Sequence, residues 1–265
     1  ASLVSGLYVL EKGLSAGLDP TLLILIGVFA ACAVLFAAHS RRAADPVLDL
    51  GLFRSLNFNA ALLAMMLLNL CYIGTQYLLP FYMEKGLGFD TLLSGLYLVL
   101  PAAVTLLVCT RVGRWSDRTS RRPFIIAANA ALTVIMVILT LIEPEMGLVP
   151  LVIALVLMGL VFGIGGGPAG SLVVECAPAD KKSAGSAVMS FIIYFGSALG
   201  TAVFSAMFSV GSGSTQGYAV LAPPDFLNGF HFAMAVGIVL AFAGVLLAAA
   251  VRKKKKNRGD EQDDR

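Results

Sequence analysis

The chain has 265 residues, of which 58% are hydrophobic and only 13% are charged, and its formal net charge is +3. Soluble domains carry about 25% charged residues, and one core of this size could not bury so much apolar surface. The composition therefore excludes an ordinary soluble globular protein. The four cysteines (Cys32, Cys71, Cys109 and Cys176) are dispersed without a CxxC pair, which favours small apolar positions over a metal site or a disulfide.

The N-terminal residues, 1–20, resemble the end of an earlier apolar segment followed by an outer loop. They lack the basic region and short apolar run of a cleavable signal peptide. We therefore expect the chain to be a fragment of a longer membrane protein.

Membrane-spanning helices need about 20 consecutive, mainly apolar residues. None of the apolar segments alternates as a strand would, so the predicted fold class is an all-α membrane protein. The first candidate segment stands apart as an extra transmembrane helix, and residues 40–56 form a charged linker. The next six build a domain over residues 57–251, and residues 252–265 form a basic, then acidic tail. The seven candidates are Thr21–His39, Phe58–Met83, Thr91–Arg111, Pro123–Ile142, Leu148–Glu175, Ala184–Val210 and Asn228–Val251.

The basic residues predict how these helices are oriented. With the loop before Pro123 in the cytoplasm, every Lys and Arg except Lys12 and Lys85 falls on the cytoplasmic side. Cytoplasmic loops of membrane proteins carry such an excess of positive charge. The linker and the C-terminal tail are therefore expected in the cytoplasm of a multi-pass cell-membrane protein. The tail would attract anionic lipids, although a stop-transfer flank explains it as well.

A charged stretch, Gly113–Arg122, lies between two of the apolar segments and has the sequence GRWSDRTSRR. A solvated positive-inside loop is one explanation of it. Its spacing also resembles the short cytoplasmic signature of the major facilitator superfamily, roughly G-x-L-A-D-R-x-G-R-K. The match covers Gly113, Asp117, Arg118 and the basic pair Arg121 and Arg122. It departs at Trp115 and Ser120, where the family prefers an aliphatic residue and glycine.

The resemblance extends over nearly the whole chain. Segments such as LPFYMEKGLGFDTLLSGLYLVLPA and VFGIGGGPAGSLVVECAPADKKSAGSAVMSF are similar to the C-terminal half of the 14-helix drug:proton antiporter branch. This resemblance implies a C-terminal six-helix bundle preceded by one extra helix. It also implies a secondary transporter that exports small amphipathic molecules by alternating access, proton-coupled in the intact protein. The implied partners are membrane lipids, a small substrate and an N-terminal transporter half, with no nucleic acid and no cofactor.

A polar stripe lies on the segment Phe58–Met83, where Asn69, Tyr72 and Gln76 follow one another at helical spacing. Polar side chains in a membrane helix usually face protein or water. In the family the first helix of each half lines the central cavity, so the resemblance implies that the stripe faces the substrate. Hydrogen bonding between helices is the alternative. A second stripe, Ser190 to Ser205, favours packing, with Tyr194 as its candidate cavity contact.

Two groups of glycines occur at four-residue steps: Gly159, Gly163 and Gly167, and then Gly196 and Gly200. Small residues at this spacing allow close helix approach. We expect both groups to pack helices, the second one against the absent half. Gly165, Gly167 and Gly170 also form G-x-G-x-x-G, but without the strand that a dinucleotide site requires.

In the family the signature residues latch the cytoplasmic side of the bundle, so the resemblance implies a conformational latch here. Its candidate members are Gly113 and the charged residues Asp117, Arg118, Arg121, Arg122 and Glu175. We expect Glu175 to pair with Arg118. Asp117 is expected to face a helix N-terminus, where a carboxylate is favoured, in the absent half.

The six-helix unit has no acidic residue at mid-membrane depth, and His231 is better explained as a structural residue than as a proton carrier. No catalytic or metal-binding constellation is recognised, so the chain is not expected to be an enzyme. The alternative to transport is a membrane interaction or assembly module, because half a transporter cannot enclose a pathway.

Overall fold

The computed structural model describes residues 50–178, 181–214 and 221–251. The expected helix Thr21–His39, residues 1–20, most of the linker and the C-terminal tail lie outside these ranges. The following sections concern the described residues.

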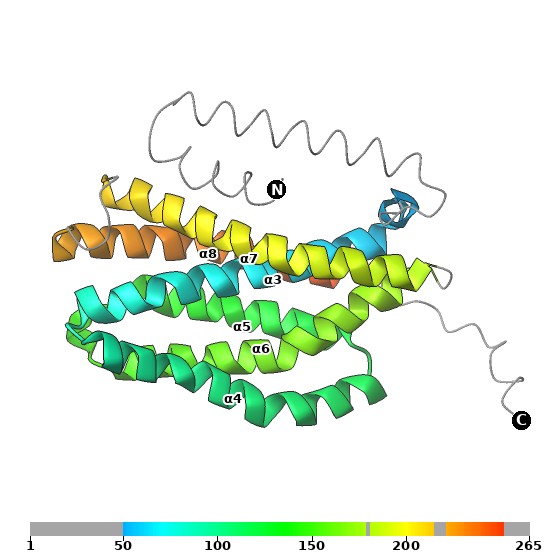
Figure 1. Ribbon diagram of the computed structural model, residues 1–265, viewed down its shortest axis with the longest axis horizontal. Helices are drawn as coiled ribbons and strands as arrows, with labels where there is room; N and C mark the ends of the chain where they lie inside the picture. Colours follow the sequence, from blue (N-terminus) through cyan, green and yellow to red (C-terminus); the bar gives the residue numbers. More distant parts are fainter. Residues whose placement is uncertain (1–49, 179–180, 215–220, 252–265) are drawn as a thin grey trace, which may run out of the picture.

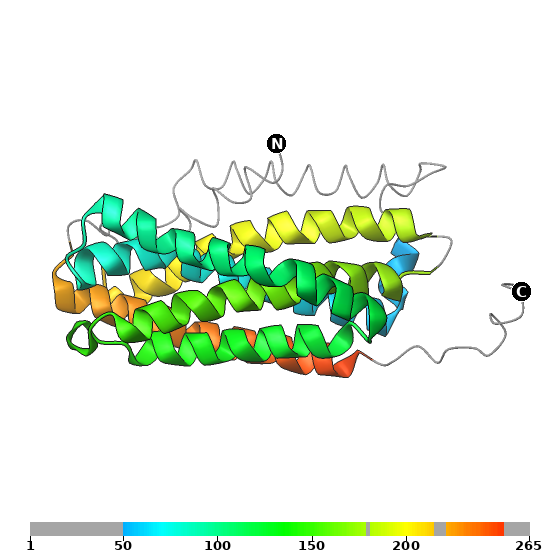
Figure 2. The ribbon, with the colours of Figure 1, turned by 90° about the horizontal axis from the view of Figure 1, so that it is seen from below.

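Six long helices pack side by side with alternating direction (Figures 1 and 2). All six are long and apolar enough to cross a membrane. The prediction of an all-α, multi-pass membrane protein is therefore confirmed. The helices are α3 (Leu56–Phe81), α4 (Thr91–Arg118), α5 (Arg122–Leu141), α6 (Val149–Cys176), α7 (Lys182–Ser212) and α8 (Pro223–Ala250). Short turns are η1 (Leu50–Arg54), η2 (Tyr82–Gly86) and η3 (Pro144–Met146).

The helix ends follow local sequence signals. Asp90 caps α4, because its carboxylate accepts a hydrogen bond from the backbone N–H of Leu93 at 2.8 Å. Proline occupies the first turn of α5, α6 and α8. The backbone N–H groups of a first turn have no partner within the helix, so proline, which lacks an N–H, costs no hydrogen bond there. Proline therefore marks three of the six helix starts.

One boundary differs from the prediction. Helix α4 continues to Arg118, seven residues past the expected end at Arg111. The first part of the charged signature is therefore helical, and only residues 119–121 connect α4 to α5. Charged side chains are expected outside the hydrocarbon, but the backbone that carries them can stay helical. Arginine is a good helix former, and its positive charge is favoured in the last turn of a helix.

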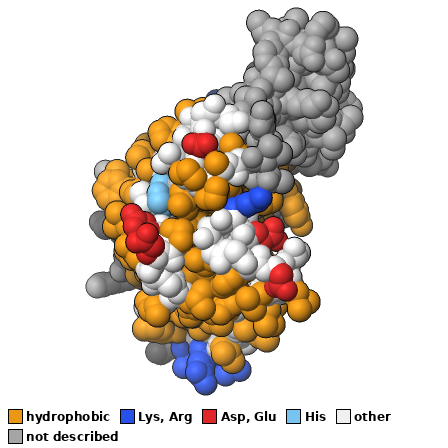
Figure 3. All heavy atoms as spheres, turned by 90° about the vertical axis from the view of Figure 1, so that its left-hand side faces the viewer, with side chains coloured by type: hydrophobic (Ala, Val, Ile, Leu, Met, Phe, Trp, Pro, Cys, Tyr) orange, Lys and Arg blue, Asp and Glu red, His pale blue; other side chains and the backbone are white. Residues whose placement is uncertain are grey.

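The two ends of the bundle differ in charge. We call one the basic end; it holds Arg54, Arg111, Arg114, Arg118, Arg121, Arg122 and Lys182. The acidic end, onto which Figure 3 looks, holds Glu84, Asp90, Glu143, Glu145 and Asp225.

Helix α3 occupies the centre of the bundle and packs against α7 and α8, while α4 packs on α6, and α5 on α6 and α8. Accordingly 61% of the residues in an apolar 18-residue stretch of the α3–η2 span are buried, against 11% in the corresponding stretch of α4 and 28% in that of α7. Figure 2 shows α7 on one face of the bundle and α5 and α8 on the opposite one. Helices α4 and α7 thus leave large apolar surfaces uncovered.

Candidate functional site

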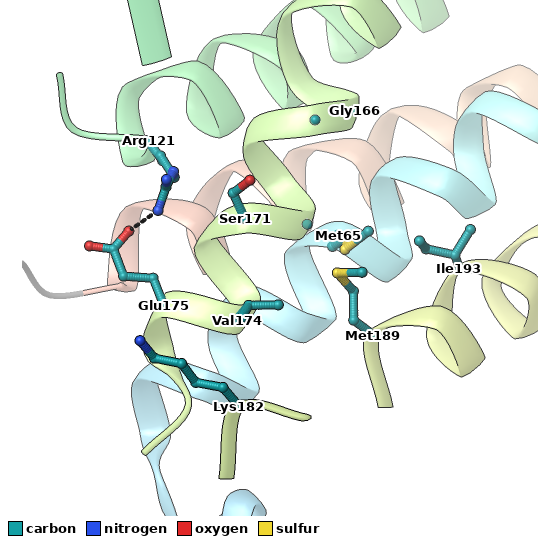
Figure 4. A pocket seen from close by; sticks show the side chains of 11 residues that line it. Met65, Arg121, Gly166, Ser171, Val174, Glu175, Lys182, Met189 and Ile193 are labelled. Atoms are coloured by element: carbon teal, nitrogen blue, oxygen red, sulfur yellow. Dashed lines mark hydrogen bonds and ion pairs between the residues drawn. The ribbon is translucent and has the colours of Figure 1, made fainter. Parts of the chain in front are cut away.

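A cleft of about 550 Å³ lies where α3, α6 and α7 meet near the basic end. Its inner wall is apolar, with Met65 from α3, Val174 from α6, and Met189 and Ile193 from α7 (Figure 4). Thioether side chains are flexible and polarisable, so they adapt to ligands of different shape. The inner wall is therefore suited to apolar groups without selecting one shape.

The mouth of this cleft is charged. Arg121, from the α4–α5 turn, donates from Nη1 to Oε2 of Glu175 at 2.9 Å, and Lys182 lines the same opening. The Arg121 side chain is 29% exposed and the Glu175 side chain 52% exposed. Water screens a pair this exposed, so it can break and re-form at a modest free-energy change.

Glycines of α6 widen the cleft. Gly166, Gly167 and Gly170 line it, and a Cβ at Gly170 would lie 3.0 Å from Sδ of Met189. A Cβ at Gly167 would meet nothing within 4 Å. Within the described residues the turn of α6 at Gly167 faces open space, so the expected packing role of Gly167 stays a prediction.

A second cleft, of about 270 Å³, lies between α4 and α6 and shares Gly166, Gly167 and Ser171 with the first. Thr105, Cys109, Gly113 and Ser116 of α4 form its other wall. Gly113, a predicted latch residue, thus lines a cleft beside α6. The glycine-rich stretch of α6 separates the two clefts and contains Pro168, which removes one backbone hydrogen bond from the helix.

The remaining predicted packing glycines lie at close helix contacts. A Cβ at Gly159 would lie 2.6 Å from the carbonyl oxygen of Pro101 on α4, and one at Gly163 would lie 3.2 Å from Cβ of Val108. The same α4–α6 contact holds a hydrogen bond of 2.9 Å from Oγ1 of Thr105 to the Gly159 carbonyl.

Gly196 and Gly200 pack α7 against α3. A Cβ at Gly196 would lie 3.1 Å from the carbonyl oxygen of Met66, and Gly200 lies against the Leu70 backbone. The neighbour of both glycines in the described residues is α3 of this chain, whereas the sequence led us to expect an absent half. The sequence could not reveal this, because glycine spacing indicates close approach without naming the helix approached.

The polar stripe of α3 continues from Met65 toward the acidic end. Asn69 is buried and donates from Nδ2 to the Met65 carbonyl at 3.0 Å, within its own helix. Tyr72 packs on Phe162 of α6, with ring centroids 4.9 Å apart. Gln76 is half-buried one turn further along.

Neither cleft is lined by Asn69, Tyr72, Gln76 or Tyr194. The stripe lies beyond the inner end of the first cleft. Tyr194 is 75% exposed on α7, next to Ile193, which does line the cleft. Substrate contact by these four residues stays a prediction.

The latch residues separate into groups. The expected Glu175–Arg118 pair is wrong, since Glu175 binds Arg121 and Arg118 is exposed on the last turn of α4. The helix carries Arg118 on its outer side, whereas the turn after it brings Arg121 to the end of α6. Arg122 donates from Nη2 to the Ala249 carbonyl near the end of α8. The side chain of Asp117 lies outside the described residues.

His231 has a structural position at the acidic end. Its Nε2 lies 2.8 Å from the carbonyl oxygen of Ile142, which follows the last turn of α5. This bond joins α8 to the end of α5 and supports the structural explanation of the histidine. Among the described residues, no group of three or more His, Cys, Asp or Glu side chains could hold a metal ion.

Sequence reasoning missed the cleft-lining residues Met65, Met189 and Ile193. Apolar residues on membrane helices are too common to mark a cavity. The only signal was the spacing of the glycines of α6, which we assigned to packing.

Comparison with known proteins gives one family match: residues 13–201 fit the model described as Major Facilitator Superfamily. A riboflavin transporter, RibZ, of Clostridioides difficile is 25% identical over 176 residues, covering 66% of this chain and 39% of RibZ. The multidrug efflux pump LfrA of Mycolicibacterium smegmatis is 25% identical over 175 residues, covering 66% of this chain and 35% of LfrA.

The quinolone resistance protein NorB of Staphylococcus aureus is 27% identical over 212 residues, covering 78% of this chain and 44% of NorB. The chain thus spans less than half the length of these three relatives. The names of LfrA and NorB agree with the resemblance to the drug antiporter branch. The family model covers most of the chain, and six helices can span a membrane. The chain therefore belongs to the major facilitator superfamily, a family of membrane transporters.

Proposed function

We propose that this chain is part of a secondary active transporter that exports small amphipathic molecules from the cell. The observation that carries the proposal is the cleft between α3, α6 and α7. It has an apolar inner wall and a charged mouth, and it opens near the basic end. By the positive-inside rule the basic end is cytoplasmic, so the cleft would admit substrates from the cytoplasm.

An amphipathic substrate suits both parts of the cleft. Its apolar part would contact Met65, Met189 and Ile193, while a polar or charged group would stay near the ion pair at the mouth. The polar stripe of α3 begins one turn beyond Met65 and would provide Asn69 and Tyr72 as further contacts when the substrate moves inward.

Alternating access would require the cytoplasmic side to open and close. The exposed Arg121–Glu175 pair joins the α4–α5 turn to the end of α6, and its modest strength suits a contact that breaks in each cycle. In the described helices the acidic residues stand near the helix ends. A proton-coupling carboxylate would therefore belong to another part of the intact protein.

Uptake into proteoliposomes tests the proposal. The chain, alone or co-expressed with a complementary six-helix half, is reconstituted, and ethidium uptake is measured under an imposed proton gradient. Met189→Trp would fill the cleft and is expected to reduce uptake at least tenfold. Val239→Trp adds the same ring at a position of α8 that is 68% exposed and does not line the cleft, and it is the matched control.

Equal uptake by both variants would refute a role for the cleft. No uptake in either arrangement would favour the second candidate function, a membrane interaction module. That alternative rests on the coverage of less than half of each of the three relatives named above.

A further inference from the structure

A row of arginines lies on one side of the last two turns of α4. Arg111, Arg114 and Arg118 are spaced by three and four residues, which places them on one face of the helix, and all three are exposed. Trp115, on the edge of the same face, is 65% exposed. We call these four residues the arginine face.

These arginines differ from the two that follow them in the chain. Arg121 binds Glu175, and Arg122 binds the Ala249 carbonyl. The guanidinium groups of the arginine face form no ion pair or hydrogen bond in the described part of the chain. Three cations on adjacent turns repel one another, so an anion bound between them would stabilise this arrangement.

The register of α4 shows which way the arginine face points. Val112 and Ser116 are buried on the side of α6. Successive residues of an α-helix are rotated by about 100° around the helix axis. Gly113 and position 117 therefore lie to one side of the line through Val112 and Ser116, and the arginines lie opposite this line or to its other side. The arginine face therefore points away from the side of α4 that carries Gly113 and position 117.

An exposed apolar residue precedes the arginine face on the same side of α4. Leu107 stands one turn before Arg111 and is 71% exposed. Trp115 packs edge-on against Phe124 of α5, with ring centroids 5.4 Å apart. Tryptophan is enriched at the boundary between hydrocarbon and headgroups. Along α4 the exposed apolar Leu107 is thus followed by the arginines and Trp115, which is the order expected where acyl chains give way to headgroups.

We propose that the arginine face binds the headgroup of an anionic phospholipid. Guanidinium groups bind phosphate oxygens in a bidentate manner, so Arg111 and Arg114 would hold the phosphodiester. Arg118, one turn further from the hydrocarbon, would contact the outer part of the headgroup. The acyl chain would lie along Leu107. Such a lipid would lie along the exposed side of α4 and would anchor the least buried helix of the bundle.

The single tryptophan of the chain makes this site directly measurable. The whole chain is reconstituted in phosphatidylcholine vesicles that contain equal mole fractions of doxyl-labelled phosphatidylglycerol or doxyl-labelled phosphatidylcholine. Quenching of Trp115 fluorescence reports the local concentration of each lipid. One basic residue at the surface favours anionic lipid by about fivefold, so we expect a preference for phosphatidylglycerol of at least about fivefold.

The variant R111Q/R114Q/R118Q should reduce this preference to less than about twofold. Its matched control, K253Q/K254Q/K255Q, removes the same charge from the C-terminal tail and should retain the preference. Equal quenching by the two lipids in the unaltered chain would overturn the proposal. An equal loss in both variants would also overturn it, because it would show bulk attraction without a site. If the triple variant fails to insert, R114Q/R118Q tests the same prediction.

Discussion

The contact of α4 with α6 at Gly159 gives a sharp prediction for Gly159→Ala. The new Cβ would lie 2.6 Å from both the Pro101 carbonyl oxygen and Cβ of Val104. Part of the obstruction is backbone, so α4 would have to move away. Overpacking of this kind costs about 1–3 kcal/mol. The movement would also weaken the Thr105–Gly159 hydrogen bond, by about 1 kcal/mol, whereas alanine improves helix propensity by about 1 kcal/mol.

The matched control is Gly167→Ala, two turns further along α6. Its Cβ would meet nothing within 4 Å, so only the gain in helix propensity, about 1 kcal/mol, is expected. Gly159→Ala should therefore lower the free energy of unfolding by about 1–3 kcal/mol, while Gly167→Ala raises it by up to about 1 kcal/mol. The two variants should differ by about 2–4 kcal/mol.

Equilibrium unfolding in mixed micelles with increasing dodecyl sulfate measures this difference, with Trp115 on α4 as the fluorescent reporter. The two substitutions exchange the same atoms in the same helix, so the intrinsic preference for alanine cancels between them. Equal stability of the two variants would refute the close α4–α6 contact at Gly159. A Gly167→Ala variant less stable than Gly159→Ala would reverse the assignment of the two glycines.

Two further predictions concern the ends of the bundle. A double-mutant cycle of Arg121→Gln with Glu175→Gln should give a coupling free energy of about 0.5–1 kcal/mol, because the pair is partly exposed. The same cycle with Arg118→Gln in place of Arg121→Gln should give none, and the opposite ranking would restore the pairing predicted from the sequence. At the acidic end, His231→Phe removes the contact with the Ile142 carbonyl and should destabilise the chain by about 1 kcal/mol. His231→Gln keeps a donor and should destabilise it less; thermal unfolding in detergent compares the two, and an equal loss would show that the hydrogen bond contributes nothing.

The helices could be predicted from sequence because the membrane imposes their length. Each apolar run must satisfy its own backbone hydrogen bonds, so hydropathy alone located all six described spans. The end of α4 could not be found in this way. Hydropathy indicates where the apolar segment ends, which is near Arg111, but the helix itself continues to Arg118.

The candidate site was predicted only in part, because sequence spacing describes one helix at a time. Glycine spacing correctly indicated close contacts at Gly159 and Gly200, but the neighbour of each depends on how the helices pack. Gly167 has the same spacing and faces open space. Glu175 could have met either Arg118 or Arg121. The turn at residues 119–121 decides between them, and no spacing rule fixes its path.

The charged signature thus combines two structural roles that its sequence does not separate. Its last two arginines join neighbouring elements: Arg121 holds the end of α6 through Glu175, and Arg122 holds the end of α8 through the Ala249 carbonyl. Arg121 is the last residue of the turn after Arg118 and Arg122 is the first residue of α5, so a displacement of the α6 end would reach α5 and α8 through adjacent side chains. Helix α4 is linked to this group by the short turn and otherwise presents its own arginines outward. A neutral side chain at Arg121 would therefore remove this link to the end of α6, while the packing of α5 on α6 and the outward arginines stay in place.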